Sequence, residues 1–340
     1  MAGSGKAHLR PKEDVLIRAE DVVVEFPASR GRIVHAVSGI SLDVKEGETL
    51  GLVGESGCGK STTAKALLQL PPPTSGTVSY KGMELTQLDQ KDLREARTDL
   101  QIIFQDPLSS LNPRRKIGEV VAEPLRVWGP RDSKTQTEKV DAMLDAVGIE
   151  PETAREKRAH EFSGGQCQRI SIARALVLNP QVIICDEPVS ALDVSVQAQI
   201  LNMLEDLKAE YGLTLVFIAH DLAVVKNISD RVAVMYLGKL CEVSESDALY
   251  SSPAHPYTEL LLDSSPAPDP DAVLDVNVIE DGDVPSPIDP PSGCRFRTRC
   301  SYASDRCIEQ EPQMQKVSGD HYVACHHPLV SVVEPAEVSA

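Results

Sequence analysis

The sequence has few aromatic residues and no long apolar run. Phe, Trp and Tyr make up 4% of its 340 residues, and no apolar stretch approaches the roughly twenty residues that span a bilayer. The first ten residues are polar and lack the apolar centre of a signal peptide. We therefore expect a cytosolic chain, and its β-branched runs alternating with helical patterns predict a parallel α/β sheet.

Positive charge is also scarce. The chain has 34 Lys and Arg against 51 Asp and Glu, which gives a net charge of −17. Proteins that bind nucleic acid without sequence preference rely on basic patches that neutralise phosphates. The composition therefore argues against a nucleic-acid partner. No internal repeat is present, so the sequence predicts one copy of its fold and not a tandem pair.

A glycine-rich loop follows the first strongly apolar segment. Residues 54 to 61, GESGCGKS, fit the phosphate-binding pattern GxxxxGK(S/T), between a predicted strand at 49–53 and a predicted helix at 60–70. Glycines let the loop point successive backbone N–H groups at a polyphosphate. Lys60 is expected to neutralise the β- and γ-phosphates, and the Ser61 hydroxyl to bind Mg²⁺.

Two carboxylates end a second apolar run. Residues 182 to 185 are Val-Ile-Ile-Cys, followed by Asp186 and Glu187. Ligands of open α/β sheets bind at the carboxyl ends of the strands, so both acids are expected at the same edge as the loop. Asp186 is expected to hold Mg²⁺, and Glu187 to act as general base on the attacking water. Acids that merely cap the next turn are the alternative, which the phosphate loop disfavours.

These motifs, in this order over about the first 260 residues, resemble the ATP-binding cassette (ABC) family. The resemblance identifies Phe162-Ser163-Gly164-Gly165-Gln166 as the signature, with Phe where Leu is commoner. It also implies that Gln105 is the Q-loop glutamine, Asp193 closes the D-loop (190–193) and His220 is the switch histidine. Phe26 is similar in placement to the aromatic residue that stacks on adenine. Taken singly, Gln105 or His220 would be an ordinary polar residue at a strand end.

The resemblance implies roles for these residues in a site that two chains complete. Glu187, His220, Lys60 and Gln105 are the expected catalytic set, and Ser61, Gln105 and Asp186 the expected Mg²⁺ ligands. The signature precedes a helix, so its N–H groups can bind a γ-phosphate held mainly by another subunit. The residues expected to contact ATP are Phe26, Gly54, Ser56, Gly57, Cys58, Gly59, Lys60, Ser61, Thr62, Gln105, Ser163, Gly164, Gly165, Gln166, Asp186 and Asp193.

The expected fold is an α/β P-loop cassette. It comprises a mixed sheet with N-terminal antiparallel strands, a helical insert at about 107–178 and a Cys-rich C-terminal extension. We predict a nucleotide-binding domain over 1–262 and an extension over 263–340. In the resembled family the helical insert docks on a membrane permease. Helices are expected at 117–127, 137–147 and 198–211, and strands within 231–242.

The C-terminal part begins with a segment that has no basic residues. Residues 263 to 289 contain eight acids and many prolines, a composition typical of a linker. Beyond it lie Cys294, Cys300, Cys307 and Cys325, separated by five, six and seventeen residues. Cys58, Cys167, Cys185 and Cys241 lie inside cassette elements and are interpreted as packing residues.

Four interpretations of the clustered cysteines remain open. Disulfides suit secreted modules more than a cytosolic chain. Zinc usually takes Cys-x-x-Cys pairs, which are absent here, although His326 and His327 could supply nitrogen ligands. An iron–sulfur cluster needs four thiolates and tolerates wider spacings, so we favour it over zinc. Four free thiols are the remaining interpretation.

Further segments narrow the resemblance to the ATPase subunits of dipeptide and oligopeptide permeases. They are residues 110–114, 123–125 and 255–258 with the apolar run at 260–262, together with the cysteine-bearing end. In that subfamily two related ATPase chains pair beneath two permease subunits, fed by an extracytoplasmic binding protein. Some members carry a 4Fe-4S cluster in this extension. The resemblance therefore implies a peripheral protein on the cytoplasmic side of the membrane that powers peptide uptake.

Two alternatives to peptide import remain at this point. Related subunits serve nickel uptake, so the cargo is open. A soluble cassette ATPase that moves no cargo is the other class. Its DNA-repair members separate the two motif halves by a long coiled coil, and no sustained heptads occur here. Ribosome-associated members normally carry two cassettes in one chain.

Overall fold

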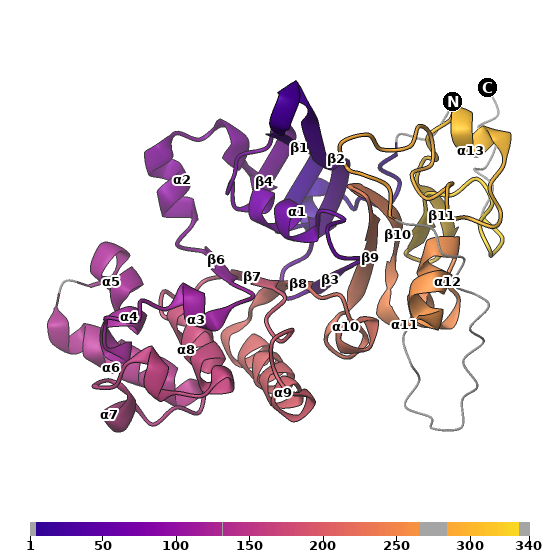
Figure 1. Ribbon diagram of the computed structural model, residues 1–340. Helices are drawn as coiled ribbons and strands as arrows, with labels where there is room; N and C mark the ends of the chain where they lie inside the picture. Colours follow the sequence, from indigo (N-terminus) through magenta and orange to yellow (C-terminus); the bar gives the residue numbers. More distant parts are fainter. Residues whose placement is uncertain (1–4, 131, 265–283, 333–340) are drawn as a thin grey trace. The chain divides into compact units, whose positions relative to one another are not determined.

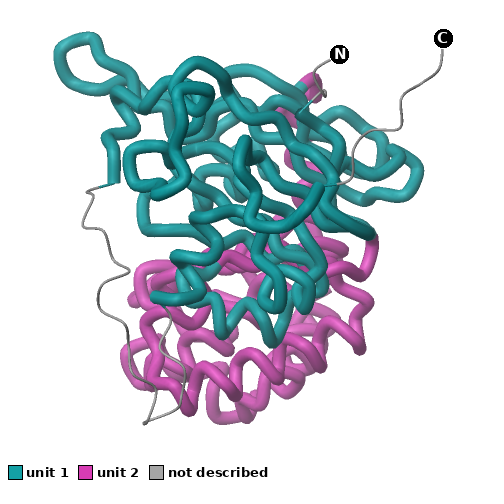
Figure 2. The backbone as a smooth tube through the Cα atoms, turned by 90° about the vertical axis from the view of Figure 1, so that its right-hand side faces the viewer, with its two compact units in different colours: residues 1–45, 50–86, 219–340 teal, residues 46–49, 87–218 magenta. Residues whose placement is uncertain are grey.

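The computed structural model describes residues 5–130, 132–264 and 284–332. The chain forms two compact units, each of which is discontinuous in sequence (Figure 2). Unit 1 comprises residues 1–45, 50–86 and 219–340, and unit 2 comprises residues 46–49 and 87–218. The predicted boundary at residue 262 concerns a different division of the chain and stays a prediction. Most of the predicted acidic linker, residues 265–283, lies outside the described residues.

Unit 1 contains an antiparallel sheet in the order β2-β1-β4-β5 and five strands in the order β11-β12-β10-β9-β3. The strands are β1 (Ile17–Pro27), β2 (Ile33–Val44), β3 (Thr49–Val53), β4 (Ser75–Tyr80), β5 (Met83–Glu84), β9 (Arg231–Tyr236), β10 (Lys239–Glu245), β11 (Gln315–Ser318) and β12 (His321–Val323). The helices are α1 (Lys60–Leu67), α10 (Leu222–Ile228), α11 (Ser246–Ser251), α12 (Pro256–Asp263) and α13 (Asp305–Glu309).

Unit 1 contains both parallel and antiparallel strand pairs. β3 pairs in parallel with β9, whereas β9, β10, β12 and β11 pair antiparallel in succession. β3 and β9 are buried along their length, as expected for strands covered on both faces. β1 instead alternates buried and partly exposed residues, the pattern of an antiparallel strand with one solvated face. The predicted N-terminal antiparallel strands and mixed sheet are confirmed.

Unit 2 combines three parallel strands with a group of helices. The strands, in the order β8-β7-β6, are β8 (Thr214–Ile218), β7 (Val182–Asp186) and β6 (Leu100–Ile103). The helices are α2 (Gln90–Ala96), α3 (Pro107–Ser110), α4 (Ile117–Val121), α5 (Glu123–Trp128), α6 (Ser133–Ala146), α7 (Pro151–Ala154), α8 (Gly164–Leu176) and α9 (Val194–Tyr211). Helices α3 to α8 form the helical insert that the sequence predicts at 107–178 (Figure 1).

The segment from 117 to 127 differs from its prediction as one helix. Helix α4 ends at Val121, and α5 begins at Glu123, with Pro124 in its first turn. Proline has no N–H to donate, so the hydrogen-bond ladder of one continuous helix would be interrupted at Pro124. Proline is well tolerated in the first turn, where that donor is not needed. The sequence therefore forms two short helices here.

The C-terminal residues 284–332 belong to unit 1. Strand β12 pairs with β10 through Glu242–Val323 and Val243–Tyr322. The carboxylate of Glu242 is fully buried and accepts hydrogen bonds from the backbone N–H groups of Ala254 and His255. It also contacts Thr258 Oγ1 at 2.6 Å and His321 Nε2 at 2.6 Å. This buried acid thus connects β10, the start of α12 and β12.

Candidate functional site

The glycine-rich loop of unit 1 has the strand–loop–helix setting that its pattern predicts. It connects β3 to α1, and Gly54, Gly57 and Gly59 adopt positive φ angles of 146°, 78° and 104°. A Cβ atom at Gly54 would lie 2.1 Å from the backbone oxygen of Met235, so only glycine fits there. Gly57 faces open space and is exposed. The loop therefore combines a tightly packed base with an open tip.

Lys60 is buried at the first residue of α1 and holds the loop closed. Its ammonium group donates to the carbonyl oxygen of Gly54 at 2.6 Å and to that of Glu55 at 3.0 Å. Cys58 is also buried, and burial raises the pKa of its thiol. Ser56 is exposed, and Ser61 and Thr62 are partly exposed in the first turn of the helix. These residues surround the N-terminus of α1, where the helix dipole favours an anion.

Two other predicted residues of unit 1 lie at the surface. Phe26 is the next-to-last residue of β1 and pairs with Val34, and 38% of its surface is exposed. Its predicted contact with adenine stays a prediction. His220 is exposed and immediately precedes Asp221, the N-cap residue of α10. The switch role of His220 also stays a prediction.

Unit 2 brings together the two acids and the Q-loop glutamine. Asp186 is buried at the last residue of β7, and Glu187 follows with a φ of 48°, which is unusual for a residue other than glycine. The amide of Gln105 donates to Glu187 Oε2 at 3.0 Å and lies 3.5 Å from Ser190 Oγ. The sequence places Gln105 and Glu187 far apart, and the parallel pairing of β6 with β7 explains their contact.

The signature begins helix α8. Ser163 is its N-cap residue, and its hydroxyl accepts a bond from the backbone N–H of Gln166 at 3.3 Å. In return, the backbone N–H of Ser163 donates to Gln166 Oε1 at 3.0 Å, which completes a capping box. Gly164 is exposed, and a Cβ atom at Gly165 would lie 2.6 Å from Val196 Cγ1. The exposed N-terminus of this thirteen-residue helix is suited to binding an anion.

The D-loop residue Asp193 is exposed and precedes α9 as its N-cap residue. Gln197 of that helix fixes the loop, because its side-chain amide donates to the carbonyl oxygens of Val189 and Leu192 at 3.0 and 2.9 Å. Asp193 thus lies on a firmly held loop at the surface of unit 2. No measured contact assigns it a ligand, so its role stays a prediction.

A large groove opens in unit 2 beside α2 and α5. Its volume is about 810 Å³, and an apolar wall that includes Val127 and Trp128 faces a basic rim of Lys91, Arg94 and Arg97. The side chains of Val127 and Trp128 are 68% and 46% exposed. Adjacent apolar side chains with this much exposed surface are typical of a binding surface.

The four clustered cysteines all lie among the described residues. Cys307 and Cys325 are buried, whereas Cys294 and Cys300 are partly exposed, and the backbone N–H of Cys294 donates to the carbonyl oxygen of Cys307 at 2.8 Å. Burial, with added repulsion from the other three sulfurs, raises the pKa of Cys325 to about 12. Across the described ranges, however, no three His, Cys, Asp or Glu side chains are grouped to hold a metal ion. The expected metal centre therefore finds no support in the geometry.

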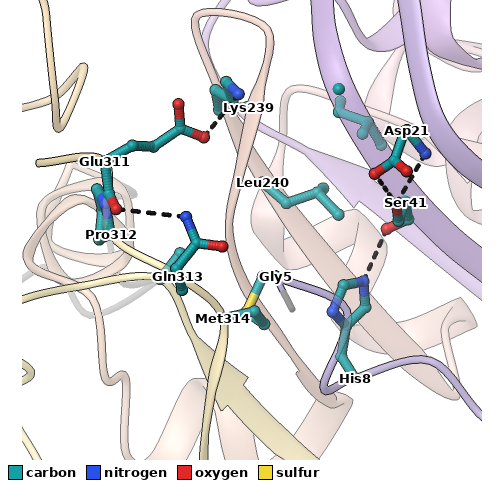
Figure 3. Close-up of a pocket in the computed structure, with 13 residues that line it drawn as sticks. Gly5, His8, Asp21, Ser41, Lys239, Leu240, Glu311, Pro312, Gln313 and Met314 are labelled. Carbon is teal, nitrogen blue, oxygen red and sulfur yellow. Dashed lines mark hydrogen bonds and ion pairs between the residues drawn. The ribbon is translucent and has the colours of Figure 1, made fainter. Parts of the chain in front are cut away.

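A polar cavity of about 250 Å³ lies elsewhere in unit 1 (Figure 3). Lys239 and Glu311, joined by a 2.7 Å ion pair, line one side, and Asp21, Ser41 and His8 line the other. His8 Nε2 contacts the carbonyl oxygen of Ser41 at 2.7 Å, and burial lowers the pKa of this imidazole. None of the residues of the ATP motifs lines this cavity.

Sequence reasoning missed the residues that support the phosphate loop from the C-terminal part. The backbone N–H of Glu55 donates to the hydroxyl of Tyr257 at 2.8 Å, and Arg299 binds the Glu55 carboxylate. Both partners lie more than two hundred residues from the loop in sequence. The His-Pro-Tyr-Thr segment at 255–258 stood out in the sequence, but nothing in its pattern indicates a contact with the loop.

The described residues contain no helix that is both long and apolar enough to cross a bilayer. Two family patterns match the chain. Residues 37–190 match the family described as "ABC transporter", and residues 241–307 match "Oligopeptide/dipeptide transporter, C-terminal region".

Known relatives match over nearly the whole chain. The oligopeptide transport ATP-binding protein OppF of Salmonella typhimurium is 51% identical over 321 residues, which cover 92% of this chain and 96% of OppF. The oligopeptide transport ATP-binding protein AppF of Bacillus subtilis is 46% identical over 322 residues, covering 92% and 98%.

Solved structures agree with these relatives. A dimeric ATP-binding cassette bound to ADP and Pi, in a post-hydrolysis state, has a TM-score of 0.62 and 29% identity, covering 68% of this chain and 98% of that chain. CbiO1 of Clostridium perfringens, part of an ABC transporter complex, has the same TM-score with 28% identity, covering 70% and 92%.

Proposed function

The chain belongs to the ABC transporter family of ATPases, and we propose that it is the ATP-hydrolysing subunit of an importer of dipeptides or oligopeptides. The 51% identity to an oligopeptide transport ATP-binding protein, over 92% of this chain, is the observation that carries the proposal. The match of residues 241–307 to the oligopeptide/dipeptide transporter C-terminal region adds to it. Nickel uptake and cargo-free ATPases receive no comparable support.

ATP binding is assigned to the loop from Gly54 to Thr62. Its open tip and the N-terminus of α1 suit a polyphosphate, and Lys60 is held where one positive charge can offset the β- and γ-phosphates. Phe26, with an exposed ring, is assigned to adenine stacking. The magnesium ligands would be Ser61, Gln105 and Asp186, whose hydroxyl, amide and carboxylate oxygens are the donors that Mg²⁺ prefers. The ion, when bound, would neutralise charge on the phosphates.

Hydrolysis is assigned to Glu187 with Gln105 and His220. Glu187 accepts a proton from water as the water oxygen bonds to the γ-phosphorus, and the bond from that phosphorus to the β,γ-bridging oxygen breaks, releasing ADP and phosphate. The 3.0 Å bond from Gln105 fixes one carboxylate oxygen of Glu187. His220, exposed after β8, would orient the water.

The second half of each site is assigned to another cassette. Ser163, Gly164, Gly165 and Gln166 begin α8 with an exposed N-terminus, which suits the γ-phosphate of ATP held by the partner chain. Asp193 lies on the firmly held D-loop and is assigned to the same dimer contact. The dimeric cassette with ADP and Pi supports a paired arrangement. We propose a related but distinct ATPase chain as the partner.

The groove of unit 2 is proposed as the docking surface for a membrane permease subunit. A partner segment bound in the groove would bury the exposed side chains of Val127 and Trp128. The rim of Lys91, Arg94 and Arg97 suits an acidic or helix C-terminal segment of that partner. Two permease subunits and an extracytoplasmic peptide-binding protein would complete the transporter. The chain would then be peripheral, on the cytoplasmic side of the membrane.

The four clustered cysteines are proposed to hold a 4Fe-4S cluster in a Cys-rich C-terminal extension. In such a cluster each iron takes one thiolate, so the four sulfurs surround a larger group than a single ion and need not converge on one point. Of the four residues, Cys294 and Cys307 are neighbours, since the backbone N–H of Cys294 donates to the carbonyl oxygen of Cys307. Anaerobic purification with iron and sulfide analysis, against Cys300→Ser, tests this; zinc or no metal would contradict it.

The cargo is tested by uptake into proteoliposomes that contain the chain with its partner ATPase, permease subunits and binding protein. We expect ATP-dependent uptake of labelled dipeptides or oligopeptides and none of nickel. Glu187→Gln in both ATPase chains is the control for turnover. Nickel uptake without peptide uptake would replace the cargo, and ATPase activity with neither cargo would favour a cassette that moves none.

A further inference from the structure

The phosphate loop is held from the C-terminal part of unit 1 by one bidentate ion pair. Arg299 Nη1 donates to Glu55 Oε2 at 2.8 Å, and Arg299 Nη2 donates to Glu55 Oε1 at 3.0 Å. Glu55 is the second residue of the loop. Two parallel N–H···O bonds fix both the distance and the orientation of a carboxylate, which a single lysine contact does not.

The geometry is also protected from water. The side chain of Arg299 is 11% exposed, and its guanidinium lies 5.9 Å from the ring centres of both Tyr236 and Phe296. Tyr257 packs against the same two rings, at 4.7 and 5.3 Å between centres. Its hydroxyl accepts the backbone N–H of Glu55. Partial burial strengthens a charge pair, since the surrounding dielectric constant is below that of water.

Glu55 in turn contacts the catalytic lysine. Its carbonyl oxygen accepts a bond from Lys60 Nζ at 3.0 Å and another from the backbone N–H of Cys58 at 3.3 Å. The side chain of Glu55 is thus bound to Arg299, its N–H to Tyr257 and its carbonyl to Lys60. A shift of Arg299 is transmitted through one residue to the ammonium group that meets the phosphates.

We propose that Arg299 is a positioning residue for ATP hydrolysis, which acts by holding Glu55 and, through Glu55, Lys60. Turns between Cys294 and Cys300 fix the backbone of the segment that carries Arg299. In one of them the backbone N–H of Arg299 donates to the carbonyl oxygen of Phe296 at 3.0 Å. Arg295 of the same segment donates to the carbonyl oxygen of Leu237. The inference depends on ATP hydrolysis and not on the cargo.

The test compares Arg299→Gln and Arg299→Lys with Arg297→Gln in the full-length chain assembled with its partner ATPase. Arg297 lies in the same segment but donates to the carbonyl oxygen of Ser292 and not to the loop, so it is a matched control. We expect Arg299→Gln to lower kcat/KM for ATP by about 10- to 100-fold. Arg299→Lys should restore part of the loss, since lysine keeps the charge without the fork.

A double-mutant cycle with Glu55→Gln separates positioning from general stability. If Arg299 acts through Glu55, the double variant should lose no more kcat/KM than the worse single variant. ATP affinity, measured with a fluorescent ATP analogue, and the urea midpoint are recorded for every variant. Additive losses, or wild-type kcat/KM in a folded Arg299→Gln chain, would overturn the proposal. A loss confined to the urea midpoint would assign Arg299 a structural role only.

A failure here is distinguishable from a failure of the proposed function. Steady-state ATP hydrolysis and nucleotide binding need no cargo. The double-mutant cycle of Arg299 and Glu55 can therefore be measured even if the chain proves to transport something other than peptides. Conversely, confirmed peptide uptake would leave the role of Arg299 to be decided by the kinetic constants alone.

Discussion

At the scale of single residues, the clearest prediction concerns Glu187, the proposed general base. We expect Glu187→Gln to keep ATP binding while lowering turnover by at least about 100-fold, because an amide cannot accept the proton of the attacking water. Bound nucleotide after gel filtration, together with phosphate release, measures both quantities. Hydrolysis at the wild-type rate would remove Glu187 from the role of base.

His255 gives a second residue-scale prediction, for stability against pH. Its Nδ1 accepts the backbone N–H of Tyr257 at 3.0 Å as the N-cap of α12, and burial lowers the pKa of the imidazole to about 4. The unfolded chain binds a proton near pH 6.5, whereas the folded chain does not until about pH 4. The free energy of unfolding therefore falls as pH drops from 6.5 to 4, by at most about 3 kcal/mol.

The control for this prediction keeps the cap and removes the titration. His255→Asn retains a side-chain acceptor that suits an N-cap position. Urea unfolding at pH 7 and pH 5 should show a smaller pH dependence for His255→Asn than for the wild type. Equal slopes would show that the acid sensitivity lies in other groups, of which buried His8, with a pKa also lowered by burial, is the first to test.

At the scale of elements, the tightly packed base and the open tip of the phosphate loop should respond differently to an added methyl group. Gly54→Ala would force a Cβ against the Met235 backbone oxygen, and we expect a loss of about 3 kcal/mol or more. Gly57→Ala meets no atom within 4 Å and carries only the strain of a positive φ, about 1 to 2 kcal/mol. Urea midpoints of the nucleotide-free proteins compare them, and equal losses would contradict this description of the loop.

Element patterns in the sequence predicted the motif-bearing parts of the fold well. The loop between β3 and α1, the acids after β7 and the helical insert all follow from apolar runs, glycines and strand-end acids. The break between α4 and α5 was missed, because the apolar pattern at 117–127 outweighed the effect of Pro124. The capping box of Ser163 and Gln166 was not predicted, although the spacing of the two residues is a local pattern.

At the scale of the whole molecule, the C-terminal part was the least predictable. Its strands are short and partly polar, so neither length nor alternation distinguishes β11 and β12 from loops. Their place depends on partners far away in sequence, as in the contact of His321 with Glu242. The support that Arg299 and Tyr257 give to Glu55 was hidden for the same reason, because no local pattern encodes a contact between distant segments.

The contacts of buried Glu242 lead to a prediction of how much the C-terminal part contributes to the free energy of unfolding. His321→Ala leaves one oxygen of a fully buried carboxylate without its 2.6 Å partner, and we expect a loss of about 1 to 3 kcal/mol. His321→Gln, which can still donate, is the control and should lose less. Urea unfolding at pH 7 provides the comparison, and a wild-type midpoint for His321→Ala would mean that Glu242 finds another partner.

Strand β12 sets a lower limit on how short a working version of this ATPase can be made. Truncating the chain after residue 264, just beyond helix α12, would remove β12 and leave β10 as an edge strand with unpaired backbone groups. An exposed edge strand of this kind can pair with the same strand of another copy and cause aggregation. A protein engineer who wants a minimal motor from this sequence would therefore have to redesign that edge before shortening the chain.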